Sequence, residues 1–254
     1  MVEDRCHGGG SQMPGVVAVL GKGGGGKTTS AATLGAVAAA AGERVALVDL
    51  DSTPTLTAWL APDLDEDATS AADVLTGQAE VVDALLRVRE RLDLLPGAVD
   101  VAAIESTVKA STVRGLVEAL RARADVVLLD LRGGVASQLS AAAAAAADLL
   151  LVPVEAAPAG VRSLKLSRRL ADELDRTISG VLPTRYNARA LVARQLIAAL
   201  DAAGFPVWPP IRRDVAAEEA PGSGELLDTY APRSRALADY RVAAERMLQA
   251  LKER

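Results

Sequence analysis

The sequence predicts an α/β fold, in which a mostly parallel, twisted sheet carries helices on both faces in three layers. Short, continuous apolar runs recur along the chain, as is typical of strands that are buried on both faces. Segments of helix length separate these runs, and such alternation produces parallel strands joined by crossover helices. No linker or internal repeat divides the chain. We therefore expect a single domain over residues 13–254, preceded by a disordered N-terminal extension at residues 1–12.

The elements follow in order from these patterns. Runs rich in Val, Leu and Ile are too short for helices and predict strands at residues 16–20, 45–49, 92–95, 126–130, 149–154, 178–183 and 207–211. Longer segments between them predict helices at residues 28–41, 70–86, 101–109, 112–124, 137–147, 160–174, 188–203 and 232–253. A turn with a short helix is expected over residues 51–60, and two prolines interrupt the last strand.

The composition excludes several classes of function. The chain has 254 residues and a net charge of −5, and only 2% of its residues are aromatic. This argues against dedicated nucleic-acid binders and against modules that stack bases on aromatic rings. The charge is unevenly spread, however, because residues 160–254 hold 16 Lys and Arg against 12 Asp and Glu. The acidic total therefore conceals a basic C-terminal part.

Cysteine and histidine are almost absent. Cys6 and His7 are the only ones, and both lie in the N-terminal extension. The chain alone therefore offers no disulfide, no iron–sulfur cluster and no histidine-based active site in its core. No apolar run reaches the roughly 18 residues of a membrane span, and the start lacks a signal-peptide pattern. We expect a soluble, cytoplasmic protein.

A glycine-rich loop joins the first predicted strand to the first helix. Residues 21–28 fit the pattern G-x-x-x-x-G-K-[ST], which needs a strand before it and a helix after it. Glycines let successive N–H groups face a polyphosphate at the helix N-terminus. Lys27 would contribute a charge to the β- and γ-phosphates, and Thr28 a hydroxyl to Mg²⁺. We predict ATP and Mg²⁺ as cofactors, with these nucleotide-binding residues: Lys22, Gly23, Gly24, Gly25, Gly26, Lys27, Thr28 and Thr29.

A second lysine in this loop is more specific. The chain has five lysines against 23 arginines, and Lys22 and Lys27 both lie in the loop. Residues 22–29 match K-G-G-x-G-K-[ST]-[ST] and thereby resemble the deviant Walker A loop of the ParA/MinD family of P-loop ATPases. The resemblance implies a P-loop NTPase fold and an ATP-sandwich dimer. It also implies that Lys22 reaches the nucleotide of the other subunit, as an arginine finger does.

Carboxylates follow two predicted strands. Asp49 and Asp51 end the second strand, and Asp130 ends the Walker B-like run at residues 126–130. The carboxyl ends of parallel strands are where α/β sheets bind ligands. The resemblance implies that Asp51 positions the attacking water near Mg²⁺ and that Asp130 holds the metal through water. We predict Lys22, Lys27 and Asp51 as catalytic residues, and Thr28, Asp51 and Asp130 as metal-site residues.

Two segments depart from the family pattern. Ser52 and Thr53 replace the usual Pro-Gln after the second Asp, and residues 131–134 replace the usual segment after Walker B. These changes leave open a member that binds ATP and dimerises but hydrolyses poorly. Arg132 would pair with a phosphate or a partner chain, or would be a surface residue; the sequence does not separate these alternatives.

The resemblance continues through the C-terminal part. Residues 180–189, 211–224 and 230–235 resemble the Soj-like partition branch, which implies an adenine pocket built from residues 184–186 and 209–212. The predicted nucleotide contacts there are Thr184, Arg185, Pro209 and Ile211.

The basic C-terminal part acquires a function through the same resemblance. Partition ATPases of this type bind DNA without sequence preference once ATP has formed the dimer, through Arg and Lys on phosphates. The first candidates are Arg185, Arg189, Arg212 and Arg213. Arg162, Lys165 and Arg169 share one helix face, which is alternatively a solvated surface. We expect a nucleoid-associated homodimer with slow hydrolysis, stimulated by a ParB-like partner, that segregates plasmid or chromosome DNA.

Three other functions occur among relatives of these ATPases. A ParA-like ATPase that positions another cargo would use the same chemistry. MinD-like membrane ATPases end in an amphipathic membrane-binding helix, whereas residues 241–254 mix both charges and predict a docked helix, so no membrane partner is expected. Cobyrinate-type amide-forming relatives would need a pocket for a large acid, of which the sequence shows no signature.

Overall fold

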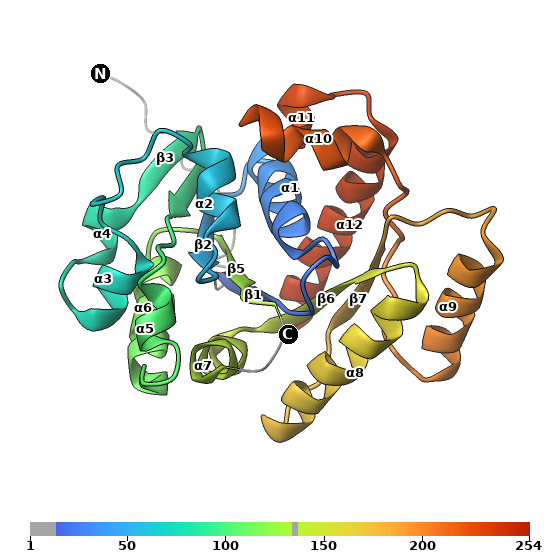
Figure 1. Ribbon diagram of the computed structural model, residues 1–254, viewed down its shortest axis with the longest axis horizontal. Helices are drawn as coiled ribbons and strands as arrows, with labels where there is room; N and C mark the ends of the chain where they lie inside the picture. The colour runs from blue at the N-terminus through green and yellow to red at the C-terminus, as the bar shows by residue number, and fades with distance from the viewer. Residues whose placement is uncertain (1–13, 134–136) are drawn as a thin grey trace, which may run out of the picture.

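The structure is a computed structural model that describes residues 14–133 and 137–254. Its centre is a seven-stranded sheet in the order β3-β4-β2-β5-β1-β6-β7 (Figure 1). All pairs are parallel except β3 with β4. The strands are β1 (Gly15–Val19), β2 (Val45–Leu50), β3 (Leu86–Arg89), β4 (Leu92–Leu95), β5 (Val126–Leu131), β6 (Leu149–Glu155) and β7 (Gly180–Thr184). The predicted mostly parallel α/β fold is confirmed, and the expectation for residues 1–12 falls outside the described residues.

Helices cover both faces of the sheet (Figure 1). They are α1 (Lys27–Ala40), α2 (Thr55–Leu60), α3 (Ala71–Thr76), α4 (Val81–Ala84), α5 (Val101–Ile104), α6 (Ala110–Arg121), α7 (Gln138–Ala146), α8 (Pro158–Glu173), α9 (Leu191–Ala202), α10 (Val215–Ser223), α11 (Leu227–Tyr230) and α12 (Arg235–Lys252). The long terminal helix α12 packs beside α1 on one face, as expected of a docked helix. Among the described residues, no helix combines the length and the hydropathy that crossing a membrane requires.

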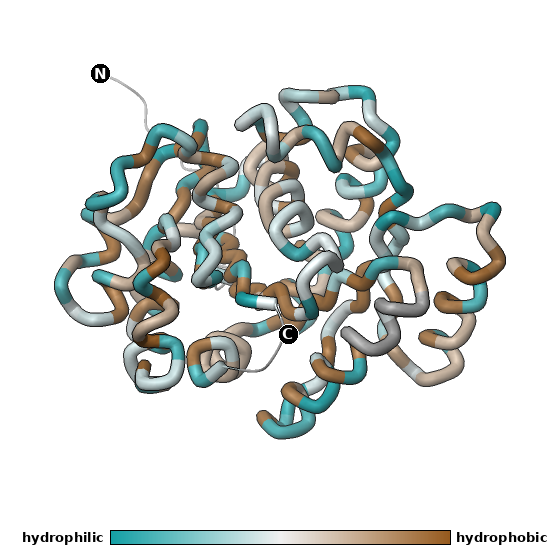
Figure 2. Tube along the Cα trace, in the orientation of Figure 1, coloured by the Kyte–Doolittle hydropathy of each residue, from teal (hydrophilic) through white to brown (hydrophobic). Residues whose placement is uncertain are grey.

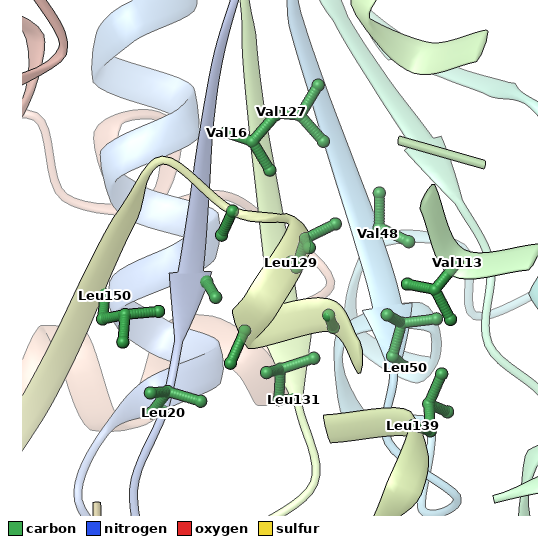
Figure 3. Packing of buried hydrophobic residues seen from close by; sticks show 14 of the residues in the cluster. Val16, Leu20, Val48, Leu50, Val113, Val127, Leu129, Leu131, Leu139 and Leu150 are labelled. Atoms are coloured by element: carbon green, nitrogen blue, oxygen red, sulfur yellow. The ribbon is translucent and has the colours of Figure 1, made fainter. Parts of the chain in front are cut away.

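The strands are apolar on both sides because each face supports a separate core. Along β1, Val16 and Ala18 enter one core, while Val17 and Val19 enter the other. Alternate strand residues point to opposite faces, so a continuous apolar run serves both cores. Figure 2 shows the amphipathic pattern of α8, where hydrophobic and hydrophilic residues alternate along the helix. Figure 3 shows the first core, where Leu129 and Leu131 of β5 lie beside Val48 and Leu50 of β2.

One predicted helix is wrong. Residues 70–86 form two short helices and the start of β3, not one continuous helix. Gly77 ends α3 in the left-handed conformation with φ of 77°, a position that favours glycine. The chain then turns back so that β3 pairs antiparallel with β4, and tertiary pairing outweighs the local helical pattern. Helix α5 is likewise shorter than the segment expected at residues 101–109.

The predicted strand at residues 207–211 is also wrong. This segment makes one isolated bridge, Val207 to Val181, and Arg212 directly after it makes a second, to Tyr186. Pro209 and Pro210 lack the N–H groups that a continuous ladder needs. Helices α10 and α11 follow where the sequence analysis placed no element, and α10 contains Pro221.

The topology fixes where the site lies. Strand β1 is central, between β5 and β6, and the segments that follow the strands meet at one edge of the sheet. Crossover connections diverge on either side of such a strand and leave room for a ligand at its carboxyl end. The glycine-rich loop leaves the sheet at this point.

Candidate functional site

The glycine-rich loop forms the entrance to α1. Gly26 is the N-cap of α1 with φ of 85°, a conformation that a glycine adopts without steric cost. A Cβ added to Gly25 would lie 2.9 Å from the carbonyl oxygen of Pro153, so β6 approaches the loop closely. Lys27 is buried at the first turn of the helix and Thr28 is half-buried. N–H groups, helix dipole and lysine therefore converge as a polyphosphate requires.

Two side chains from the end of β7 hold this loop. The Thr184 hydroxyl donates to the carbonyl of Gly25 at 2.9 Å, and the Arg185 guanidinium donates to the carbonyl of Gly24 at 2.8 Å. The structure thus brings two of the residues predicted for nucleotide binding directly against the phosphate loop, about 160 positions away in sequence.

The Walker B carboxylate lies near the end of β5, between β2 and β1. In the sheet register, Asp130 is opposite Asp49 of β2 and Val19 of β1. It is 1% exposed, and neither carboxylate oxygen has a hydrogen-bond partner within the described chain. Burial, reinforced by the charge of Asp49, raises the pKa of Asp130 to about 7, while the Thr28 hydroxyl and the Lys27 ammonium act in the opposite direction.

These atoms fit a magnesium ion. A buried carboxylate without a partner is costly, and a hard divalent cation beside it would supply the missing interaction. The Thr28 hydroxyl and Asp130 offer the oxygen ligands that Mg²⁺ prefers, with nucleotide phosphates completing the set. The residues present therefore suit the ion that the sequence predicts.

The two aspartates at the carboxyl end of β2 have different surroundings. Asp49 is fully buried and accepts hydrogen bonds from the backbone N–H and the hydroxyl of Thr57, at 2.9 and 2.8 Å. Burial raises the pKa of Asp49 to about 6, and the Thr57 hydrogen bonds partly offset this. Asp51 is half-buried, and its carboxylate accepts only the nearby Thr53 N–H among the described groups, at 2.9 Å. Asp51 is thus the more available carboxylate, as its predicted catalytic role requires.

Thr57 is a residue whose part in the site the sequence analysis missed. Its hydroxyl donates to Asp49 and accepts the N–H of Gly97 at 2.8 Å. It thereby joins the ends of β2 and β4 through α2. The only signal in the sequence was that Thr57 lies in the short helix predicted directly after Asp51.

The segment after Walker B closes over the loop. Arg132 pairs with Glu105 at 2.5 Å, which places it in an intramolecular ion pair. A Cβ added to Gly133 would lie 2.5 Å from the Gly23 nitrogen and 2.9 Å from the Lys27 ammonium. A side chain at position 133 would therefore clash with the phosphate loop, and residue 134 lies outside the described chain.

The two segments predicted to form the adenine pocket run side by side. The Tyr186 N–H donates to the carbonyl of Ile211, and the Ile211 N–H donates to that of Pro183. Pro209 is half-buried, whereas the Ile211 side chain is packed in the core with Trp208. The segments are therefore adjacent as expected, and the individual adenine contacts stay predictions.

The four arginines predicted to contact DNA have different environments. Arg212 is held by Asp239 in a two-pronged ion pair, with Nη2 at 2.8 Å from the carboxylate. Arg213 and Arg185 both form ion pairs with Glu218, with each Nε 3.5 Å from the Glu218 Oε1. Among described groups the guanidinium of Arg189 has no hydrogen-bond or ion-pair partner.

The basic face predicted on α8 is less uniform. Lys165 and Arg169 are exposed, and the side chain of Arg162 lies outside the described part. Arg169 lines a pocket of about 240 Å³ together with Lys22 and Arg132, beside the phosphate loop.

This geometry can be compared with known proteins. A family described as the CobQ/CobB/MinD/ParA nucleotide binding domain matches residues 16–227. The chain belongs to this family. The chromosome-partitioning ATPase Soj of Thermus thermophilus is 34% identical over 242 residues, which cover 91% of this chain and 94% of Soj. The maintenance of carboxysome distribution protein A of Synechococcus elongatus is 31% identical over 210 residues, covering 74% and 81%.

A solved structure agrees with the same assignment. That of a cobyrinic acid a,c-diamide synthase from Mycobacterium smegmatis, with bound ADP and magnesium, has a TM-score of 0.78 and 30% identity, covering 94% of this chain and 96% of that one. The family membership confirms the predicted P-loop ATPase with ATP and Mg²⁺ as its cofactors.

Proposed function

We propose that this ATPase forms an ATP-sandwich dimer that binds DNA without sequence preference and uses slow hydrolysis to position or segregate a cargo. The observation that carries the proposal is an arginine-lined groove of about 810 Å³, which Pro209, one of the residues predicted to contact adenine, also lines. Its lining includes Arg189, Arg212, Arg213 and Arg235, together with Tyr186 from the segment that follows β7.

The groove suits a phosphate backbone. Arg189 and Arg235 have no side-chain partner among the described residues, and Arg213 has only its shared contact with Glu218. These guanidinium groups are available for the phosphate contacts that supply sequence-independent affinity. Asp214 and Asp239 also line the groove, but both are engaged, by helix N-termini and by Arg212 respectively.

Backbone hydrogen bonds connect the groove to the residues that hold the phosphate loop. Arg213 N–H donates to the carbonyl of Tyr186, and Tyr186 follows the pair of residues that hold the phosphate loop. The hydrogen-bonded segment that contains Tyr186 therefore connects the phosphate loop to the groove. Two such grooves on one dimer would double the cation count, which supports binding that depends on ATP.

The chain's own residues suit phosphoryl transfer to water. Lys27 and the N–H groups of α1 bind the phosphates, Thr28 and Asp130 would hold Mg²⁺, and Asp51 orients water. The bound ion supplies charge neutralisation at the phosphates. Lys22, exposed on the loop, would reach the nucleotide of a second subunit. Asp51→Ala should accumulate an ATP-bound dimer, and Lys22→Ala should keep ATP binding while losing dimer-linked turnover.

The test is a gel shift on random-sequence DNA with ATP, ADP or no nucleotide across a salt series. We expect a shift with ATP at low salt that weakens steeply as salt rises. Arg189→Ala should lower affinity and reduce the slope against log salt by about one. Arg194→Ala, an exposed arginine of α9 outside the groove, is the control and should leave both unchanged. The absence of any ATP-dependent shift would contradict the proposal.

The cargo is a separate question. The similarity to Soj, a chromosome-partitioning ATPase, supports a chromosome as cargo, whereas the similarity to the carboxysome-distribution protein supports a different cargo. Stimulation of ATP turnover by a cognate ParB-like protein would favour the first. A liposome pull-down with ATP tests the MinD-like alternative.

A further inference from the structure

The tip of the phosphate loop has no side-chain packing of its own. Gly23 and Gly24 are exposed, and a Cβ added to either would meet nothing within 4 Å. Glycine loses more conformational freedom on ordering than any other residue. The conformation of this tip, which carries Lys22, therefore depends on its backbone hydrogen bonds and on the backbone of Gly133, which lies against Gly23.

Those bonds come from the end of β7. In a trans peptide, the carbonyl of one residue and the N–H of the next point in opposite directions. Arg185, by holding the Gly24 carbonyl, therefore also orients the Gly25 N–H, which reaches the Lys22 carbonyl at 3.4 Å and closes the turn. Thr184 orients the Gly26 N–H in the same way through the Gly25 carbonyl.

The backbone of Arg185 is itself unusual. Its φ is 49°, in the left-handed region that residues other than glycine rarely adopt. Such a conformation persists only where the surroundings impose it, and it is typical of functional sites. The surroundings here are the hydrogen bond from Tyr186 N–H to Ile211 and the carboxylate of Glu218, 3.5 Å from the guanidinium.

We propose that Arg185 is a positioning residue of the nucleotide site, which fixes the Gly24 carbonyl and hence the turn that carries Lys22, and that Glu218 holds its guanidinium in place. When the backbone N–H groups that bind the phosphates are already ordered, nucleotide binding does not have to include the entropic cost of ordering the loop. The inference rests on the ATPase site alone, and it concerns catalysis only through the proposed role of Lys22.

The decisive variant is Arg185→Asn. Asparagine tolerates the left-handed conformation but has no guanidinium, so the backbone is kept while the Gly24 contact is lost. We expect the dissociation constant for Mg·ATP, measured calorimetrically without DNA, to rise about threefold to tenfold. Amide hydrogens of residues 23–26 should exchange faster in the nucleotide-free protein, while the thermal midpoint stays unchanged or rises.

Conservative and charge controls separate positioning from general electrostatics. Arg185→Lys keeps a donor that can reach the carbonyl and should recover most of the affinity. Arg194→Asn removes an exposed arginine elsewhere and should change nothing. Glu218→Gln should weaken the binding of Mg·ATP by about twofold, because the Arg185 guanidinium loses its carboxylate partner. Glu219→Gln, whose carboxylate instead accepts the Tyr230 hydroxyl at 3.1 Å, should leave the affinity unchanged.

The proposal would be overturned if Arg185→Asn had the affinity for Mg·ATP and the amide exchange of the wild type. It would also be overturned if Arg194→Asn or Glu219→Gln lost as much affinity as Arg185→Asn. All these measurements omit DNA. A failed gel shift would therefore refute the DNA-binding proposal without touching this one.

Discussion

At the scale of single residues, the carboxylates of the site differ in burial and in hydrogen-bond partners. Asp49 is satisfied by Thr57, Asp51 is half-buried, and Asp130 is buried without a partner. The sequence marked all three as strand-end acids. Their division of roles comes from burial and from hydrogen-bond donors that other segments contribute.

We expect Asp130 to make the stability of the nucleotide-free protein depend on pH. Its folded-state pKa of about 7 exceeds the ordinary value of 3.8, so the folded state binds the proton more tightly than the unfolded state does. The stabilisation is complete below pH 3.8 and is lost as pH rises through about 7. Asp130→Asn, which cannot ionise, should therefore match the wild type in acid and exceed it at pH 8.

Urea unfolding from about pH 3.5 to 8, with EDTA present, measures this difference in the free energy of unfolding. We expect roughly 2 to 4 kcal/mol at pH 8, of the order that the pKa shift implies. Parallel stability curves for the two proteins would show that Asp130 is not the cause of the dependence.

At the scale of elements, the same residue type has opposite consequences on two helices. Gly35 of α1 faces the sheet, where an added Cβ would lie 2.7 Å from Leu47 Cδ2. Gly115 of α6 faces open space, with nothing within 4 Å of an added Cβ. Helix α1 can thus lie close to β2 and β5 because position 35 has no side chain.

We expect Gly35→Ala to destabilise the protein by about 1–3 kcal/mol through overpacking. Gly115→Ala should stabilise it by about 0.5–1 kcal/mol, since alanine costs less backbone entropy in a helix. Chemical denaturation of the two variants beside the wild type checks the sign of each change. Equal effects would mean that packing against Leu47 does not set the position of α1.

At the scale of the whole molecule, one carboxylate joins segments from both ends of the chain. Asp148 accepts the Val16 N–H at 2.7 Å and Arg121 at 2.8 Å, and it also pairs with Arg254. Both arginines donate to the Pro14 carbonyl as well. The start of β1, the end of α6, the entry to β6 and the last residue thus meet at the edge of the sheet opposite the nucleotide site.

Arg121→Ala should destabilise the protein by about 1–3 kcal/mol, because the half-buried Asp148 and the Pro14 carbonyl each lose a donor. Arg123→Ala, two residues further and exposed, is the matched control and should change stability by less than about 0.5 kcal/mol. Thermal and urea unfolding, together with amide exchange at residues 15–17, measure the effect. Similar losses in both variants would assign it to α6 itself.

The sequence by itself determined the parallel strands, the phosphate loop and the candidate residues, because each depends on local spacing that needs no distant partner. The prediction from the sequence was wrong at residues 70–86 and 207–211, where strand pairing and proline decide the structure. Only the tertiary structure decided which predicted arginine does what. Arg185 reaches the phosphate loop, Arg212 is held by Asp239, and Arg189 stays unpaired among the described groups. A guanidinium binds the acceptor that the fold brings near it, and Gly24 is 161 positions from Arg185 in the chain.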